Sequence, residues 1–577
     1  MRTIQASLAC SLIILAAACG PATTGADDDA GGDDTACVDG QRRCSGTSYQ
    51  QCQDATWTTT QDCPNACDDT LGCVLCEPGT GTCNGDTSTA CRPDGQGYFD
   101  EYCDPLMGST CNPNSGVCEG ACSAFALGQS YIGCNYYPTV TSQLVNPSFQ
   151  FGIAVSNTSG TDATVTIDSG ALGTPLTITV GAGQVAVQYL PWVPALKRCN
   201  TQGGVECGAP ESYGALAVDG AYHLRSTQPV TVYQFSPLDY TSGGAFSYSN
   251  DASLLLPTNA WTGQYMVPAW PAWDTGFAGV MPGIIAITAS QDATMVTVTT
   301  KAPTTGGDGA PSFSPGAPQT VTLNAGDVLE LMSQSGDLTG SSVVADKAVQ
   351  VIAGHHCTQV PIGYTACDHI EESIFPVESL STEYLVTANL LPSTGQPRNQ
   401  VVRVIATQAN TTVTFDPAVA QPQTLANPGD FLEIPNQAAD FYVTADHKII
   451  VSHYMVGQDA PPAAGTGDPA MTLAVPTDQY RLDYQFHAPT NYESNYVNVT
   501  APTGATVSLD GVNLDPGQFT AIGTSGFGVA RVQLSNAGNG THAASSSMPF
   551  GITVYGYGQY TSYWYPGGLD LNPIPVD

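Results

Sequence analysis

From about Ser123 onward, the chain is built of short runs in which apolar and polar residues alternate, separated by turn residues such as Gly, Pro, Asn and Asp. Alternation with a period of two is typical of β-strands that bury one face. One such run recurs four times after a small-residue turn: ATVTI from Ala163, ATMVTV from Ala293, TTVTF from Thr411 and ATVSL from Ala505. No sustained helical periodicity is present, so the pattern predicts an all-β fold.

Two further landmarks recur with matching spacing. The first is a strand-like run: QPVTVYQF around Pro229, KAVQVIAG around Ala348, HKIIVSHY around Ile449 and MPFGITVYG around Pro549, with successive spacings of 119, 101 and 100 residues. The second is an Asp-led apolar run that ends at Pro257, Pro376 and Pro476, with spacings of 119 and 100. Agreement between independent landmarks indicates a tandem repeat.

The predicted repeats occupy residues of about 147–270, 283–390, 400–490 and 495–566, within a β region spanning 123–577. Each holds six or seven short strands, the last of them an aromatic strand such as QYRLDYQF, which suits a β-sandwich-like module. Four such modules in a row form an elongated or closed array, and a β-propeller-like closed array is the alternative architecture.

The N-terminus reads as an export signal. Residues 1–18 combine Arg2, an apolar core and small residues before Cys19. The Ala17-Ala18-Cys19 ending resembles a bacterial lipobox, which predicts lipidation of Cys19 and an outer-membrane lipoprotein facing outside. Cleavage by the ordinary signal peptidase, giving a secreted protein, is the alternative. Residues 19–36 are small and acidic, which predicts a disordered linker.

Charge narrows the set of partners. The chain carries 50 acidic and 14 basic side chains, a formal net charge of -36. Such a chain repels nucleic acid and anionic bilayers, so we expect no nucleic-acid partner and contact with a membrane only through the lipid.

Cysteines repeat near the N-terminus. The segments 37–75 and 76–122 each contain a set of six cysteines, from Cys37 to Cys73 and from Cys76 to Cys118, and the first three of each set are offset by 39 residues. This spacing predicts two small disulfide-rich modules produced by tandem duplication, since modules of this size need cross-links for stability. Zinc binding is the alternative for close pairs such as Cys73 and Cys76. Six cysteines allow fifteen pairings, and the spacing does not choose among them.

Further disulfide cysteines are predicted outside these two modules: Cys122, Cys134, Cys199, Cys207, Cys357 and Cys367. Of these, Cys122 is expected to pair with Cys134. Cys357 and Cys367 lie in AGHHCTQVPIGYTACDHIEESIFP, residues 353–376, between two predicted strands, and a disulfide between them would close that connection.

The same segment resembles the signature of the IgGFc-binding protein family. In that signature a strand leads into Gly-His-x-Cys, and Cys-x-His-x-x-Glu, an apolar residue, Pro and a Tyr-bearing strand follow. The matching residues here are Gly354, His355, Cys357, Cys367, His369, Glu372 and Pro376. Relatives of this kind are secreted or surface proteins linked to mucus and adhesion, so the resemblance implies a binding role.

Metal and catalytic chemistry leave weaker signals. His355, His356, Asp368 and His369 offer imidazole and carboxylate ligands, but adjacent histidines on a strand point to opposite faces unless a bulge intervenes. We therefore expect no metal or cofactor, and a hydrogen-bonded structural role for His355 and His369. No motif of a hydrolase nucleophile, zinc protease, phosphate loop or EF-hand is present, so we expect no enzyme.

Aromatic residues in Pro- and Gly-bounded loops are candidate binding residues: Trp270, Trp273, Tyr563 and Trp564. The alternative is that these rings pack between modules. Together the observations predict a lipid-anchored cell-surface binding or adhesion protein that recognises an extracellular protein or glycan. A secreted carbohydrate-active hydrolase and a structural envelope component without a specific ligand are the alternatives.

Overall fold

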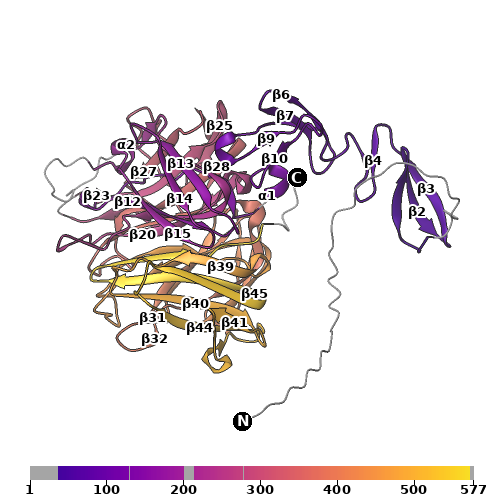
Figure 1. Ribbon diagram of the computed structural model, residues 1–577. Coiled ribbons are helices and arrows are strands. Elements are labelled where there is room, and N and C mark those ends of the chain that lie inside the picture. The colour runs from indigo at the N-terminus through magenta and orange to yellow at the C-terminus, as the bar shows by residue number, and fades with distance from the viewer. Residues whose placement is uncertain (1–36, 129, 200–212, 277–278, 572–577) are drawn as a thin grey trace, which may run out of the picture. The chain divides into compact units, whose positions relative to one another are not determined.

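The computed structural model describes residues 37–128, 130–199, 213–276 and 279–571 (Figure 1). They form two compact units, one of residues 37–78 and 91–97, the other of residues 79–90 and 98–571. We call the second unit the head. No helix among the described residues is long and apolar enough to cross a membrane.

The two six-cysteine modules share one disulfide connectivity. The first pairs Cys37–Cys52, Cys44–Cys67 and Cys63–Cys73, and the second pairs Cys76–Cys91, Cys83–Cys111 and Cys103–Cys118. In both, the first cysteine joins the third, the second joins the fifth and the fourth joins the sixth. The duplication predicted from spacing is therefore matched by identical cross-linking, and disulfides rather than zinc hold the modules.

The strands of these modules are short. They are β1 (Arg42–Ser45), β2 (Ser48–Gln53), β3 (Thr56–Asp62), β4 (Ala66–Asp68), β5 (Gly72–Val74), β6 (Gly81–Asn84), β7 (Thr87–Cys91), β8 (Tyr98–Tyr102), β9 (Thr110–Cys111) and β10 (Cys118–Glu119). The second module is divided between the two compact units, so the predicted boundary between residues 75 and 76 is not a boundary between units.

The described part of the head contains four large antiparallel sheets, one in each of four modules. Module 1 has β11 (Gly133–Tyr136), β12 (Phe151–Asn157), β13 (Ala163–Ser169), β14 (Leu176–Val180), β15 (Val185–Leu190), β17 (Tyr222–Ser236) and β20 (Asp251–Leu255). Module 2 has β21 (Thr262–Val267), β24 (Gly283–Ala289), β25 (Thr294–Thr299), β26 (Gln319–Leu323), β27 (Val328–Ser333), β28 (Ser341–Thr358) and β29 (Asp368–Ser373). Its edge strand β16 (Ala215–Ala217) comes from the chain segment before β17.

Modules 3 and 4 repeat this plan. Module 3 has β30 (Ser381–Val386), β33 (Gln400–Ala406), β34 (Thr411–Asp416), β35 (Gln423–Leu425), β36 (Phe431–Gln437), β37 (Phe441–Met455) and β38 (Met471–Leu473). Module 4 has β39 (Arg481–His487), β40 (Ser494–Pro502), β41 (Val507–Leu509), β42 (Val512–Asn513), β43 (Thr520–Ala521), β44 (Phe527–Leu534), β45 (Thr541–Gly558) and β46 (Thr561–Pro566).

The remaining described elements are short and lie in connections. They are α1 (Ala124–Leu127), α2 (Pro194–Lys197), β18 (Thr241–Ser242), β19 (Ala245–Phe246), β22 (Trp273–Asp274), β23 (Val280–Met281), β31 (Leu390–Leu391), β32 (Gln396–Pro397), η1 (Pro105–Met107), η2 (Thr258–Ala260), η3 (Val377–Ser379), η4 (Thr477–Gln479) and η5 (Pro516–Gln518).

Each module is organised by one long strand: β17, β28, β37 or β45, of 15 to 18 residues. In module 2, residues 342–345 of β28 pair with β25, whereas residues 349–355 pair with β24. The long strand therefore belongs to both halves of its module, and the outer strands curl around it. Alternation explains the burial, since Val296 and Val298 on β25 face the core while Met295 is exposed.

A buried tyrosine fixes the first strand of every module. Tyr136, Tyr265, Tyr384 and Tyr484 each donate a hydroxyl hydrogen bond to a carbonyl of the long strand, at 2.5 to 2.6 Å, and accept one from the backbone N–H three residues earlier. The aromatic strand predicted to end each repeat is thus the first strand of the next module. Its hydroxyl serves two backbone groups that a register shift beside it leaves unpaired.

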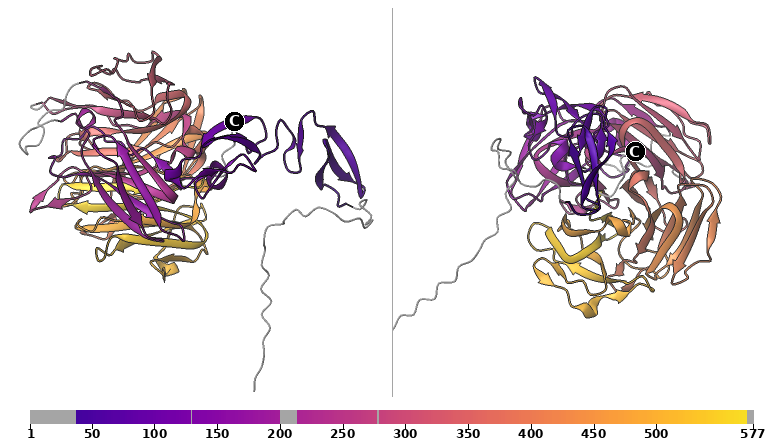
Figure 2. Two further views of the ribbon diagram at one scale, coloured as in Figure 1. Left: turned by 45° about the horizontal axis from the view of Figure 1, so that its top comes forward. Right: turned by 90° about the vertical axis from the view of Figure 1, so that its right-hand side faces the viewer.

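The four modules close into a ring around their last strands. In the head, β20 lies against β29, β29 against β38, β38 against β46, and β46 against β20. The right-hand view of Figure 2 shows the modules arranged around a common centre. Modules 1 and 4 also meet where the Tyr233 hydroxyl donates to the Gly567 carbonyl, at 2.8 Å. The head is therefore a closed array of sandwich-like modules. Its closure matches the β-propeller-like closed array that the sequence analysis gives as the alternative.

Candidate functional site

The family-signature residues lie where β28 ends and β29 begins, next to the centre of the ring. Cys357 and Cys367 form the predicted disulfide, with their Cα atoms 5.4 Å apart. Gly354 lets the two strands approach, because a Cβ atom at this position would lie only 1.8 Å from the Ile370 carbonyl oxygen. Cys122 and Cys134 are also bonded as predicted. Cys199 is disulfide-bonded, as predicted. Cys19 and Cys207 lie outside the described residues, so the lipidation of Cys19 and the disulfide of Cys207 stay predictions.

The adjacent histidines of the signature serve separate partners. A register shift follows His355, whose Nδ1 accepts a hydrogen bond from the Cys357 backbone N–H at 3.2 Å. His356 Nδ1 lies 2.7 Å from the Ser142 hydroxyl. Both rings are fully buried, and burial, followed by the charge of His369, lowers the pKa of His355 to about 3. These histidines are neutral packing residues at neutral pH.

His369 joins a buried network between modules 1 and 2. Its Nε2 lies 3.2 Å from Glu371 Oε2, which also accepts a hydrogen bond from the Thr141 hydroxyl. The Gln234 amide donates to the other Glu371 oxygen at 2.8 Å. None of these side chains has measurable exposure. The described residues contain no group of three or more His, Cys, Asp or Glu arranged to hold a metal ion.

One carboxylate, that of Asp251, connects all four central strands. Its Oδ1 accepts hydrogen bonds from the backbone N–H groups of Ala252, at 2.9 Å, and Trp564, at 3.1 Å. Its Oδ2 accepts from those of Glu371 and Met471, both at 3.0 Å. The donors belong to β20, β46, β29 and β38. We call this arrangement the axial hub.

Other buried acids reinforce the axial hub. Asp368 accepts hydrogen bonds from the backbone N–H of Asn250, at 2.8 Å, and the hydroxyl of Thr561, at 2.9 Å. Glu372 accepts from the Thr472 hydroxyl at 3.2 Å. Burial raises the pKa of Asp368 and Glu372 well above the usual range for carboxyls. Asp368 and the signature residue Glu372 thus bind the modules to one another and do not face solvent.

Three of the four predicted binding aromatics are buried, which corrects the expectation that they are exposed. Trp270 packs against Tyr454, Trp564 packs against His453, and the Tyr563 hydroxyl donates to Asn495 Oδ1 at 2.7 Å. Tyr563 and Trp564 lie on β46, one of the four central strands, and Trp270 lies in the connection after β21. These three residues therefore follow the alternative interpretation, in which the rings pack between modules. Trp273, on β22, is partly exposed.

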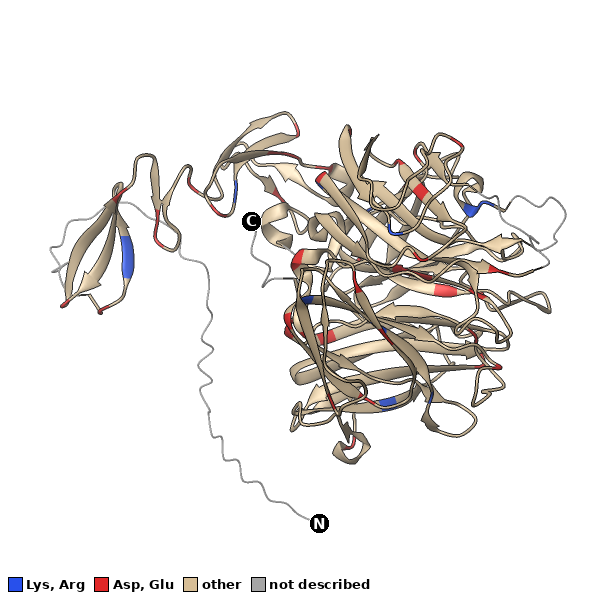
Figure 3. Cartoon of the chain, turned by 180° about the vertical axis from the view of Figure 1, so that it is seen from behind, with Lys and Arg blue, Asp and Glu red and all other residues tan. Residues whose placement is uncertain are grey.

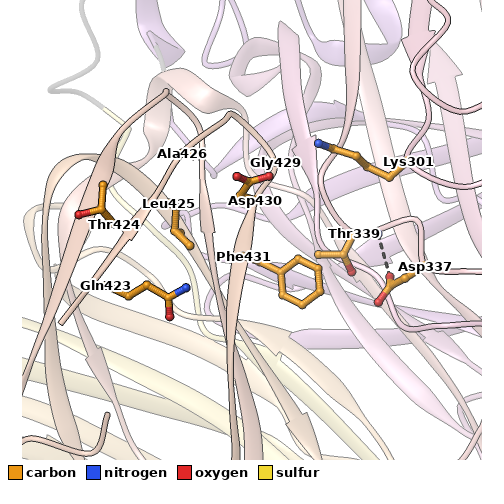
Figure 4. Close-up of a pocket in the computed structure, with 10 residues that line it drawn as sticks. All are labelled: Lys301, Asp337, Thr339, Gln423, Thr424, Leu425, Ala426, Gly429, Asp430 and Phe431. Atoms are coloured by element: carbon orange, nitrogen blue, oxygen red, sulfur yellow. Dashed lines mark hydrogen bonds between the residues drawn. The ribbon is translucent and has the colours of Figure 1, made fainter. Parts of the chain in front are cut away.

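A hollow of about 510 Å³ lies between modules 2 and 3 (Figure 4). It is lined by Lys301, Asp337, Thr339, Gln423, Thr424, Leu425, Ala426, Gly429, Asp430 and Phe431. Its carboxylates already have partners in the chain: Asp337 accepts from Arg403 Nη1 at 2.9 Å, and Asp430 accepts from the Asn427 backbone N–H at 2.9 Å. Lys301 Nζ donates to the Pro428 carbonyl at 3.2 Å. The charged side chains that line this open hollow are therefore already paired within the chain, and they are not arranged as a prepared ligand site.

Exposed side chains gather instead on four equivalent loops. Each loop connects the long strand of a module to its last strand, and they comprise residues 237–250, 359–367, 456–470 and 559–560. We call them together the four-loop surface. The sequence does not mark these loops as one surface, because they differ in length and share no motif. Only their equivalent position after the recurring strand-like run relates them.

Comparison with known proteins identifies the family. The family model described as IgGFc binding protein matches residues 251–556, more than half of the chain. The chain belongs to the IgGFc-binding protein family. The match begins at Asp251 and spans the signature, which confirms the resemblance seen in the sequence.

A human relative in the IgGFc-binding family is named IgGFc-binding protein. It is 27% identical over 250 residues, which is 42% of this chain and 4% of the human protein. The chain thus spans only a small fraction of that relative's length.

Proposed function

We propose that this chain is an extracellular protein-binding protein, tethered to the bacterial outer membrane by a lipid on Cys19 and presenting the head to an adhesion partner. The observation that carries the proposal is the family match over residues 251–556, in a family one of whose members is named for binding IgG Fc. The inward position of the signature acids and histidines supports a binding rather than a catalytic role, because substrates have no access to them.

The acidic surface and the disulfides fit this setting. Carboxylates are spread over the head and basic side chains are few (Figure 3). Disulfides such as Cys357–Cys367 persist in oxidising compartments. A rigid closed ring offers a preorganised surface, which lowers the entropic cost of association.

A binding assay with the purified mature chain tests the proposal. The immobilised partners are IgG Fc and a secreted mucin, each before and after enzymatic deglycosylation. We expect saturable binding to at least one protein that survives deglycosylation. Binding that disappears with the glycans would make the chain a lectin, and turnover of the glycans would make it a hydrolase. For the anchor, Cys19→Ser should release the protein from the membrane fraction, and unchanged retention would exclude lipidation of that residue.

A further inference from the structure

The four-loop surface is continuous. Tyr248 and Tyr560, from the loops of modules 1 and 4, bring their ring centroids within 6.4 Å. The Tyr560 backbone N–H donates to the side chain of Gln458, in the loop of module 3, at 3.1 Å. The Asp459 N–H donates to the Thr365 carbonyl, in the loop of module 2, at 3.2 Å. Four segments far apart in sequence therefore form one surface.

Large apolar side chains are exposed on this surface. Phe246 and Tyr248 are 37% and 39% exposed, and Ile362 and Tyr364 are 44% and 39% exposed. Single exposed apolar residues need no explanation, but rings that gather on contacting loops are typical of interaction sites. The disulfide Cys357–Cys367 and the contacts between loops hold these side chains in place.

The exposed charge around these rings is negative, since Arg398, which donates a hydrogen bond to the Gly457 carbonyl of the third loop at 2.9 Å, is buried. The loops contain no Lys, Arg or His, whereas Asp239 and Asp459 lie within them. Glu493, which is exposed, borders them: it accepts hydrogen bonds from the Tyr240 hydroxyl at 3.2 Å and the Thr466 hydroxyl at 3.1 Å. Exposed rings and exposed carboxylates are complementary to a cationic side chain.

The head already holds one cation by this chemistry. The Arg403 guanidinium lies 4.4 Å from the centroid of the Trp270 ring and 4.7 Å from that of Phe431. It donates hydrogen bonds to Asp337 at 2.9 Å and Glu433 at 2.8 Å. The four-loop surface carries the same two ingredients, aromatic faces and carboxylates, without the arginine.

The four-loop surface also lies far from the Cys-rich residues around Asp104 and Gly108 that belong to the head. Arg225, near the start of β17, contacts Asp104 beside η1, and the Thr227 backbone lies next to Gly108. The first loop leaves β17 at its other end, after Ser236. Eleven residues of extended strand separate the two ends by roughly 30 Å. A partner on the loops would therefore not meet the disulfide-rich residues that pack on the head.

We propose that the four-loop surface binds a Lys- and Arg-rich segment of an extracellular protein, whose cations stack on Tyr248, Tyr364 and Phe246 and pair with Asp459 and Glu493. This inference rests on the proposed function, since it names the surface and the partner chemistry for the same binding role. A glycan partner is less well matched, because the exposed charges beside the rings are carboxylates, which favour a positively charged partner.

The test uses the mature full-length chain and a fluorescent oligolysine peptide, with the lysine-acetylated peptide as a neutral probe. Tyr364→Ser and Asp459→Asn are the test variants. Met295→Ser and Asp483→Asn are controls that remove an exposed apolar side chain from β25 and an exposed carboxylate from β39. We expect each test variant to weaken peptide binding by about tenfold, the controls to leave it unchanged, and the acetylated peptide not to bind.

The following outcomes would overturn this inference. Equal losses in test and control variants would mean diffuse attraction to the net negative charge. Equal binding of the acetylated peptide would remove the role of cations. Competition by mucin oligosaccharides at the same loops would assign the surface to glycans. Saturable binding of a protein partner that is unaffected by Tyr364→Ser and Asp459→Asn would refute the surface but leave the proposed function standing, whereas absence of any protein partner would refute both.

Discussion

Replacing Asp251 by alanine should loosen the whole ring, because this carboxylate is the shared acceptor of the axial hub. The substitution leaves the buried N–H groups of Glu371, Met471 and Trp564 without an acceptor. Each unsatisfied buried donor costs about 1 to 3 kcal/mol, so the gross loss is about 3 to 9 kcal/mol. Truncation also removes a buried carboxyl whose pKa burial raises, which offsets part of this loss. We therefore expect the unfolding free energy to fall by about 3 kcal/mol.

Asp346→Ala is the matched control. Asp346 accepts a single backbone N–H, that of Met295, at an exposed site on module 2, and its loss should cost less than about 1 kcal/mol. Urea unfolding followed by both tryptophan fluorescence and far-ultraviolet circular dichroism gives the free energies, and coincidence of the two curves tests whether the ring unfolds as one unit.

Amide hydrogen exchange measures the local effect of Asp251→Ala on individual backbone N–H groups. The amides of Met471 and Trp564 lie in different modules from residue 251, so lost protection at both would show that one side chain orders distant strands. If Asp251→Ala unfolds with the same free energy as Asp346→Ala and both amides stay protected, the hub is not what holds the modules together.

Three further predictions concern other elements. Burial raises the pKa of Glu330 to about 8, so its stabilising contribution is complete below about pH 4.5 and is lost as pH rises to about 8. Between these pH values the unfolding free energy of the wild type should fall by about 5 kcal/mol more than that of Glu330→Gln, as measured by urea unfolding. If the unfolding free energies of the two proteins change with pH in parallel, the raised pKa of Glu330 is contradicted. Replacing Cys357 and Cys367 together by serine should lower the unfolding free energy by about 2 to 3 kcal/mol and weaken oligolysine binding; unchanged thermal unfolding would show that the loop needs no closure. Tyr384→Phe removes the hydroxyl that bonds the Ile449 carbonyl and should cost about 1 to 3 kcal/mol in urea unfolding, whereas a neutral effect would deny the tyrosine its fixing role.

The sequence predicts what depends on local pattern. Alternation gave strands such as β13 and β25, recurrent spacing gave four modules, and a separation of ten residues between Cys357 and Cys367 gave a disulfide that the structure contains. The structural role of His355 and His369 followed from the direction of side chains on a strand, and both rings are hydrogen-bonded and buried.

What the sequence did not predict depends on contacts between distant residues. Asp251 meets Trp564 across more than three hundred positions, so no local pattern marks either as part of a hub. Six cysteines permit fifteen pairings, and the folded path alone selects three. Trp270 and Trp564 were misplaced because Pro and Gly indicate a turn in the backbone but not the direction in which the following ring packs. The module boundaries shifted for a related reason, since spacing is the same whether a strand ends one repeat or starts the next.

Ring closure also sets an order of events for a chain that is made from its N-terminus. Strand β20 is synthesised about three hundred residues before β46, so Asp251 must wait for the final strand to arrive before its last donor exists. Until then the incomplete head exposes the Asp251 carboxyl and backbone N–H groups of the central strands, which form their hydrogen bonds only when the ring closes. A nascent or truncated chain therefore differs from the mature protein in that its central strands are accessible. Proteases that degrade incomplete polypeptides would cleave such a chain more readily than the closed ring.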